Sequence, residues 1–252
     1  MISFAASTRN EWDKLIRRKK YIVFLCIGVG ICLIWAVLGR LLSEFAIRQG
    51  GLSLRISPTP MGTLGFFLQI LIPFLMFMGV TDLLTVEGAE QTMKAMAFRP
   101  VERWKLYASK ILAVMIYAAM YLVCIFIVCA TLNQLFGKPL RIVELLIALT
   151  SYALTLIPLA VLASYAAMIA LLGRSGTLTM FLLLLSYLLL SVLPVFFPIL
   201  SEMLFTSYLS WYNLWIGALP SATKLMHMLI IVLGYGTVFF TAGSLIFERK
   251  EY

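Results

Sequence analysis

The sequence predicts an all-α polytopic membrane protein with six transmembrane helices, and three observations lead there. Hydrophobic residues make up 62% of the chain and charged residues 12%, against roughly 45–50% and 25% in soluble domains. The mean hydropathy is +1.01. Several apolar runs reach the ~20 residues that a spanning helix needs. We therefore expect residues 1–252 to form a single transmembrane domain.

Residues 1–20 predict a short amphipathic helix in the headgroup region rather than a span. Thr8 and Glu11 have the spacing of a capping box, which would start the helix at Thr8. Trp12 lies on the apolar face that follows, and a dense basic cluster runs from Lys14 to Lys20. The alternative is a disordered basic tail.

The six apolar runs predict spans at about 21–42, 61–80, 111–132, 142–172, 177–200 and 225–247. Pro73 predicts a kink in the second span, because membrane helices tolerate an internal proline. Pro158 predicts a kink or tilt in the long fourth run rather than two separate helices. The fifth span should break between Pro194 and Pro198.

Residues 201–223 form an unusual connection before the last span, rich in aromatic side chains. Tyr208, Trp211, Tyr212 and Trp215 are spaced as one stripe of a helix. Aromatic rings with polar tips favour the membrane–water interface. We expect a short interfacial or re-entrant helix in the outer leaflet. The alternative is a loop packed on the helix bundle.

The distribution of basic residues predicts the orientation. Fourteen of the 20 Lys and Arg residues lie on the side that holds both termini, residues 82–110 and Arg174. Basic residues gather on the cytoplasmic side of membrane proteins. We therefore expect a multi-pass protein of the plasma membrane with both termini in the cytoplasm.

The polar stretch 82–110 mixes both signs of charge and separates the second and third spans. It predicts one helix from about Leu83 to Phe98, with Met93 and Met96 on one face. Pro100 should end this helix and open a second one. Such a segment is either a docking surface for a soluble partner or a loop lying on the lipid, and the residues alone favour neither.

The second of these helices should lie on the membrane surface through Trp104 and Tyr107 before it enters the third span. Lys110 lies where a lysine can extend its ammonium group to the interface. We expect Lys110 to be an interfacial anchor.

A family resemblance enters at this segment. Glu87-x-x-x-x-Thr92-Met93, then Arg99-Pro100-Val101-Glu102-Arg103, then Lys110 resembles the signature of type-2 ABC exporter permeases. The chain departs from that pattern with Gln91 for glycine, Met93 for leucine and Glu102 for serine. The start Asn10-Glu11-Trp12-x-Lys14-Leu15 also resembles the family, as does the layout of six spans.

The resemblance implies the permease subunit of a bacterial ATP-driven exporter. Residues 1–20 would be an elbow helix, and the segment after the second span would be the coupling helix. The permease would pair with a second copy or a related permease and bind cytoplasmic ABC ATPase subunits. ATP and Mg would be bound by those ATPases, since this chain has no G-x-x-x-x-G-K-[ST] loop. The direction of transport rests on the resemblance alone.

Two sets of site residues follow. The expected ATPase-coupling interface consists of Glu87, Glu90, Thr92, Met93, Met96, Arg99, Pro100, Val101 and Arg103. The expected interfacial anchors are Trp12, Lys110, Tyr208, Trp211, Tyr212 and Trp215.

Other functional classes fit less well. The basic residues lie beside hydrophobic runs, which does not suit nucleic-acid binding. His227 is the single histidine, and the four cysteines lie in apolar runs without metal-ligand spacing. The absence of catalytic motifs disfavours a membrane enzyme, so we expect no catalytic or metal site. A self-contained secondary transporter or channel is the alternative, but the spans lack an internal carboxylate. That lack favours a hydrophobic or amphiphilic substrate, such as a peptide antibiotic or a lipid-like molecule.

Overall fold

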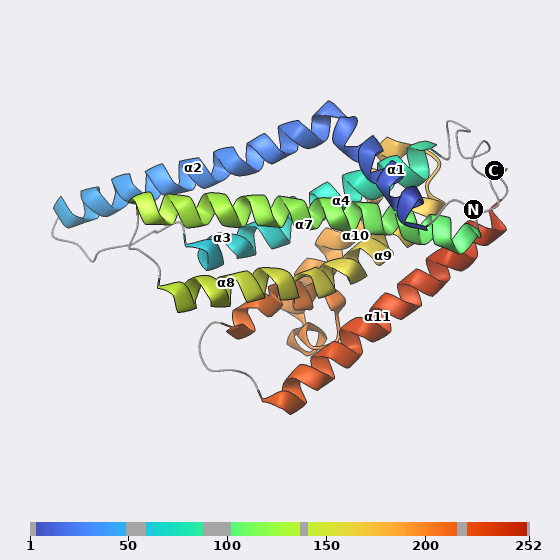
Figure 1. The fold of residues 1–252 in the computed structure, drawn as a ribbon. Coiled ribbons are helices and arrows are strands. Elements are labelled where there is room, and N and C mark those ends of the chain that lie inside the picture. The colour runs from blue at the N-terminus through green and yellow to red at the C-terminus, as the bar shows by residue number, and fades with distance from the viewer. Residues whose placement is uncertain (1–3, 49–58, 88–101, 137–140, 216–220, 251–252) are drawn as a thin grey trace.

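The computed structural model describes residues 4–48, 59–87, 102–136, 141–215 and 221–250, and within them it is helical with no strand. Within these residues, six helical segments are long and apolar enough to cross a membrane: 19–42, 60–86, 103–136, 142–172, 176–196 and 225–249. This confirms the predicted all-α, six-span architecture. The first helix starts and the last helix ends at the same end of the bundle (Figure 1).

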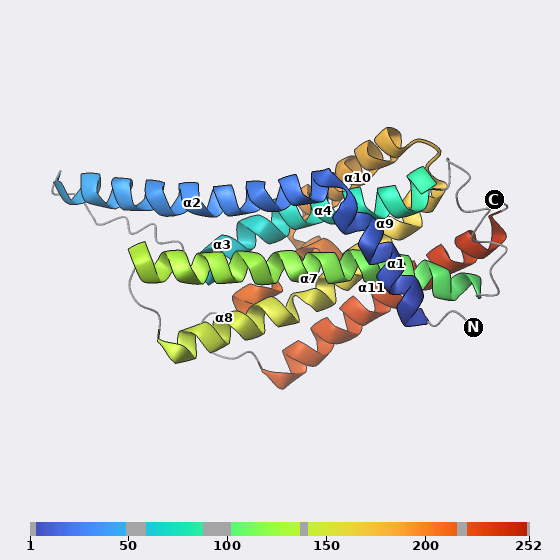
Figure 2. The same cartoon turned by 45° about the horizontal axis from the view of Figure 1, so that its top comes forward.

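The N-terminal helix α1 (Phe4–Arg17) crosses the bundle at an angle to α2 (Lys19–Arg48), which is the first span (Figures 1 and 2). One residue, Arg18, separates them. The predicted capping box is wrong. Thr8 lies inside α1, and its hydroxyl donates to the Phe4 carbonyl at 3.1 Å.

The second span lies at the centre of the bundle. It comprises α3 (Pro60–Phe66), the π-helical turn η1 (Phe67–Leu71), α4 (Ile72–Val80) and a second π-helical turn, η2 (Thr81–Val86). About two thirds of its hydrophobic window is buried (67%), against 11% for the fifth and sixth spans. The fifth and sixth spans thus present mostly apolar outer faces to their surroundings.

The third span is one continuous helix, α7 (Arg103–Phe136). The expected surface helix before this span is therefore not separate, because its residues form the first turns of α7. Trp104 is exposed there, whereas Tyr107 is fully buried.

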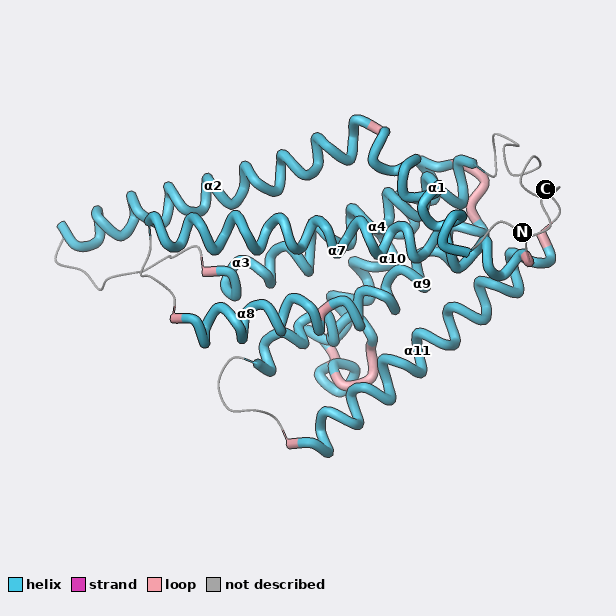
Figure 3. Tube along the Cα trace, in the orientation of Figure 1, coloured by secondary structure: helices cyan, strands magenta, loops and turns pink. Residues whose placement is uncertain are grey.

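The fourth span is kinked, as Pro158 predicts. Helix α8 (Ile142–Leu154) and helix α9 (Leu156–Leu172) meet at Thr155, whose backbone stays in the right-handed helical region. The fifth span, α10 (Gly176–Phe196), passes through Pro194 and ends before Pro198. Figure 3 shows how short the described connections are.

The carbonyls that two prolines leave without a helical partner are bonded by neighbouring hydroxyls. A proline has no N–H for the carbonyl four residues earlier. Opposite Pro73, the Gln69 carbonyl accepts from the Tyr187 hydroxyl at 3.0 Å. Opposite Pro194, the Leu190 carbonyl accepts from Thr206 at 3.1 Å. Both carbonyls therefore keep a hydrogen-bond partner in spite of the prolines.

The connection before the last span folds into two 3₁₀ helices, η3 (Pro198–Ser201) and η4 (Phe205–Trp215), and α11 (Ala222–Arg249) follows. Here the structure differs from the predicted interfacial stripe. Tyr208, Trp211 and Tyr212 are all buried, and η4 packs on the bundle. The Tyr212 hydroxyl lies against Gly65 of the second span. The side chain of Trp215 lies outside the described part.

At two helix crossings, a tyrosine hydroxyl of one helix packs against a glycine of the other. The Tyr121 hydroxyl lies against Gly28, and the Tyr107 hydroxyl lies against Gly243, so a Cβ at either glycine would overlap with the ring. Both hydroxyls are buried and accept or donate no hydrogen bond in the described part of the chain. These two glycines thus serve contacts within the chain rather than a seam between chains.

A substitution at one of these crossings tests the packing. Gly243→Ala should destabilise the protein by about 1–3 kcal/mol, because the added methyl group overpacks the contact with Tyr107. The double variant with Tyr107→Phe should recover part of the loss, since the hydroxyl has gone while the ring carbon Cζ still lies 2.8 Å from the added Cβ. The measurement is the apparent melting temperature in detergent. Gly234→Ala is the control on the same helix, with nothing within 4 Å of the added Cβ.

Candidate coupling site

The predicted ATPase-coupling residues fall on both sides of a gap in the described chain. Glu87 and Arg103 are described, at the two edges of the segment. The rest of the set lies outside the described residues: Glu90, Thr92, Met93, Met96, Arg99, Pro100 and Val101. The structure therefore shows what holds the two ends of this segment.

Two carboxylates and two ammonium groups alternate in a ring where α1, η2 and α7 meet. The Lys110 Nζ atom lies 2.6 Å from Glu87 Oε2 and 3.1 Å from Glu11 Oε2. The Lys14 Nζ atom lies 3.0 Å from Glu11 Oε1 and 3.1 Å from Glu87 Oε1. Each ammonium group thus bridges both carboxylates. We call Glu11, Lys14, Glu87 and Lys110 the ion-pair ring.

The ring is buried and electrically balanced. The side chains of Glu11 and Lys110 are each 1% exposed, that of Glu87 is 7% exposed, and Lys14 opens to the surface at 28%. Charges leave water only when they are paired, and two acids facing two bases meet that condition. Breaking such a set by removing one member is far more costly than removing an opposite pair.

Lys110 therefore differs from the expected interfacial anchor. It lies on the buried stripe of α7, between Tyr107 one turn before it and Val114 one turn after it. A lysine on that stripe points into the bundle, so its ammonium group needs buried carboxylates rather than the lipid interface. Trp12, another expected anchor, is half-buried against Tyr117, with ring centroids 6.3 Å apart.

Glu11 and Lys14 are ring members that the expected site did not include. The signal was present in the sequence. Glu11 shares the buried face of α1 with Thr8 and Leu15, so a carboxylate stands on the apolar side of an otherwise basic helix. A charge at such a position indicates a buried partner, whereas the capping-box interpretation assigned Glu11 to the helix start.

The acidic residue inside η2, Asp82, binds the start of the first span. Asp82 is 5% exposed. Its Oδ1 accepts from Lys20 at 2.7 Å, and its Oδ2 accepts from the Tyr21 hydroxyl at 2.7 Å. The Arg18 guanidinium lies 3.1 Å from Oδ2. Arg18 is the residue that separates α1 from α2, so Asp82 holds the bend between these helices.

The π-helical turn explains how Asp82 and Glu87 face the same N-terminal segment. In an α-helix, residues five apart point about 140° away from each other, because each residue turns about 100°. The wider π-turn bonds residue i to i+5, and here the Glu87 N–H donates to the Asp82 carbonyl. Both carboxylates therefore lie on one side of η2, towards α1 and the start of α2.

Arg103 occupies the other edge of the segment and contacts the end of the last span. Its Nη1 donates to the Glu248 carbonyl at 2.7 Å. Nearby, Lys250 donates to the Leu171 carbonyl at 2.7 Å, at the end of α9. Burial, and then the Arg174 guanidinium, lower the pKa of Lys250. Basic groups at helix C-termini satisfy the last carbonyls, so this end of the bundle ties together α7, α9 and α11.

The ion-pair ring joins three elements of the fold. In the part of the chain that the structure describes, no three His, Cys, Asp or Glu side chains are grouped to hold a metal ion. The ring instead fixes η2, α1 and α7 to one another, immediately before and after residues 88–101.

The fold is that of a multi-pass helical membrane protein. The family model described as "ABC-2 family transporter protein" matches residues 8–185, which is more than two thirds of the chain and includes the whole ion-pair ring. The chain belongs to this family. It is therefore an ABC-transporter permease, a multi-pass membrane protein whose family implies an ABC ATPase as partner. A comparison with curated proteins gives no match.

Proposed function

We propose that this chain is the permease subunit of an ATP-driven exporter. A separate ATPase would dock on residues 88–101 and drive the spans between two conformations. The observation that supports this most is the ion-pair ring. Its members Glu87 and Lys110 precede and follow the docking segment in the sequence and form an ion pair with each other. A force applied between them reaches α1, the second span and the third span without passing through a flexible link.

The remaining parts of the proposal follow from charge and exposure. The positive-inside rule puts the ring, the docking segment and both termini in the cytoplasm of a bacterial cell. The described charged residues of the spans lie near span ends, which suits a hydrophobic or amphiphilic substrate. A second permease, either an identical copy or a relative, would cover part of the exposed outer faces. ATP and Mg would bind in the ATPase and not in this chain.

Capture of the ATPase tests the proposal. The tagged chain, purified from its host in mild detergent, should bring down a soluble ABC ATPase in stoichiometric amount. Met96→Asp should abolish this capture, because the charged side chain removes an adaptable apolar contact. The control is Met203→Asp, which changes an exposed methionine (61%) outside the docking segment.

Two results would contradict the proposal. If the wild-type chain comes down alone, it is a self-contained transporter or channel. If Met96→Asp still captures the ATPase fully, the docking segment is elsewhere.

A further inference from the structure

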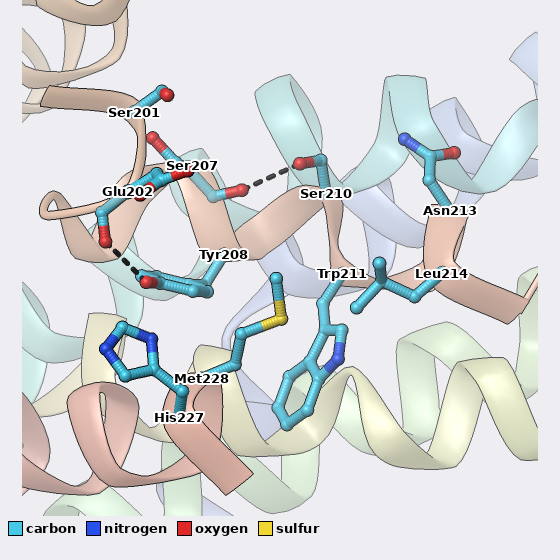
Figure 4. A pocket seen from close by; sticks show the side chains of 10 residues that line it. All are labelled: Ser201, Glu202, Ser207, Tyr208, Ser210, Trp211, Asn213, Leu214, His227 and Met228. Carbon is cyan, nitrogen blue, oxygen red and sulfur yellow. Dashed lines mark hydrogen bonds between the residues drawn. The ribbon is translucent and has the colours of Figure 1, made fainter. Parts of the chain in front are cut away.

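A cavity of about 310 Å³ lies between η4 and the first turns of α11, distant from the ion-pair ring. Figure 4 shows its ten lining residues. They include Glu202, Tyr208, Trp211, His227 and Met228, with serine hydroxyls at the edge. It adjoins the starting end of α11, opposite the end that holds Arg249. Under the proposed orientation it faces the outside of the cell.

The lining has the chemistry of a cation site. It offers one carboxylate, from Glu202, two aromatic faces, from Tyr208 and Trp211, and one thioether, from Met228. Lys and Arg are absent from the ten lining residues. Aromatic faces and a carboxylate together attract ammonium groups, whereas an anion would meet no fixed positive charge here.

The backbone of Glu202 is held in place, and its carboxylate is open to a ligand. The Tyr208 hydroxyl donates to the backbone carbonyl of Glu202 at 2.5 Å, which fixes this residue at the rim. The Glu202 side chain is exposed and has no ion pair with the described Lys and Arg residues. Burial, and then the Glu202 charge, raise the pKa of Tyr208, in keeping with a carboxylate close to that ring.

Trp211 forms part of the cavity wall, with its indole nitrogen buried. Its side chain is 5% exposed, and its indole N–H has no hydrogen-bond partner among the described residues. A buried donor without a partner is costly.

We propose that this cavity binds the ammonium end of an amphiphilic organic amine, with its apolar part against Trp211, Leu214 and Met228. The inference rests on the proposed function, since the amine would be the substrate that the transporter moves. The carboxylate and the aromatic faces hold the positive charge.

Binding to the purified chain tests this without the ATPase. The probe is hexyltrimethylammonium, titrated calorimetrically into the protein in an uncharged maltoside detergent, so that no lipid ammonium group competes. Hexanoate and hexanol are the matched anionic and neutral probes. Hexyltrimethylammonium should bind saturably, and the other two should bind about tenfold more weakly or not at all.

Glu202→Gln should weaken binding of the ammonium probe about fivefold. Glu144→Gln is the matched control, since it removes one carboxylate at the same end of the bundle but outside the cavity. Equal binding of all three probes, or unchanged binding in Glu202→Gln, would overturn the assignment. Because no ATPase is present, such a failure would leave the capture experiment and the proposed function unaffected.

Discussion

Lys110→Met should destabilise the folded protein by about 3–5 kcal/mol, the usual cost of leaving a buried charge without its partner. Lys110 is 1% exposed and binds both carboxylates of the ion-pair ring. Without its ammonium group, Glu11 and Glu87 each lose a cation that lies within 3.1 Å of both carboxylates. The measurement is the apparent melting temperature in detergent, together with the fraction of monodisperse protein.

Lys105→Met is the matched control on the same helix. Lys105 is 39% exposed and pairs with Glu102 within its own turn. An exposed pair of this kind contributes less than about 1 kcal/mol, so the melting temperature should barely move. Equal losses of melting temperature in the two variants would mean that the ion-pair ring stabilises the fold no more than an exposed ion pair does.

Two double variants should separate stability from coupling. Glu11→Gln with Lys110→Met leaves Glu87 paired with Lys14 at 3.1 Å, a bond between η2 and α1. Glu87→Gln with Lys110→Met leaves Glu11 paired with Lys14 at 3.0 Å, a bond within α1. Both rings stay neutral, so both variants should be more stable than Lys110→Met alone. Only the first keeps a charge bond from α1 to the edge of the docking segment.

The second double variant should therefore reduce ATP-driven transport about tenfold or more relative to the first, within the usual range of coupling energies between sites. ATP hydrolysis by the captured ATPase should continue in both. The measurement is the ratio of transport to ATP hydrolysis in reconstituted vesicles. Equal ratios in the two variants would show that coupling does not pass through the contact between Glu87 and Lys14.

The sequence predicted the number of spans and their approximate positions well, since hydrophobic length is a strong local signal. The kink near Pro158 could also be predicted from the sequence, because a proline without an N–H perturbs the helix that contains it. The wrong predictions concerned polar residues whose environment was inferred from the residues next to them in the sequence. Lys110 was assigned to the interface because it precedes an apolar run, and its partners Glu11 and Glu87 come from two other elements.

The aromatic stripe of residues 208–215 shows the same limit. Its spacing indicates one face of a helix but not what covers that face. Tyr208 and Trp211 are buried against the bundle, where the stripe alone suggested lipid headgroups. The π-helical turn at Asp82 was equally invisible, because nothing in TDLLTV distinguishes it from an ordinary helical turn. The ion-pair ring could have been proposed only from the conflict between charge and apolar face at Glu11.

The hydroxyls that bond the carbonyls opposite Pro73 and Pro194 bear on how the spans can move. Tyr187 joins α10 to the second span, and Thr206 joins η4 to α10. Sliding α10 away from either neighbour would leave a bare carbonyl in hydrocarbon. Interhelical bonds in membranes are worth roughly 0.6–2 kcal/mol each, which is small beside the free energy of ATP hydrolysis. If the spans change conformation as proposed, these two hydrogen bonds hold α10 in its present position and can be broken at a small cost in free energy.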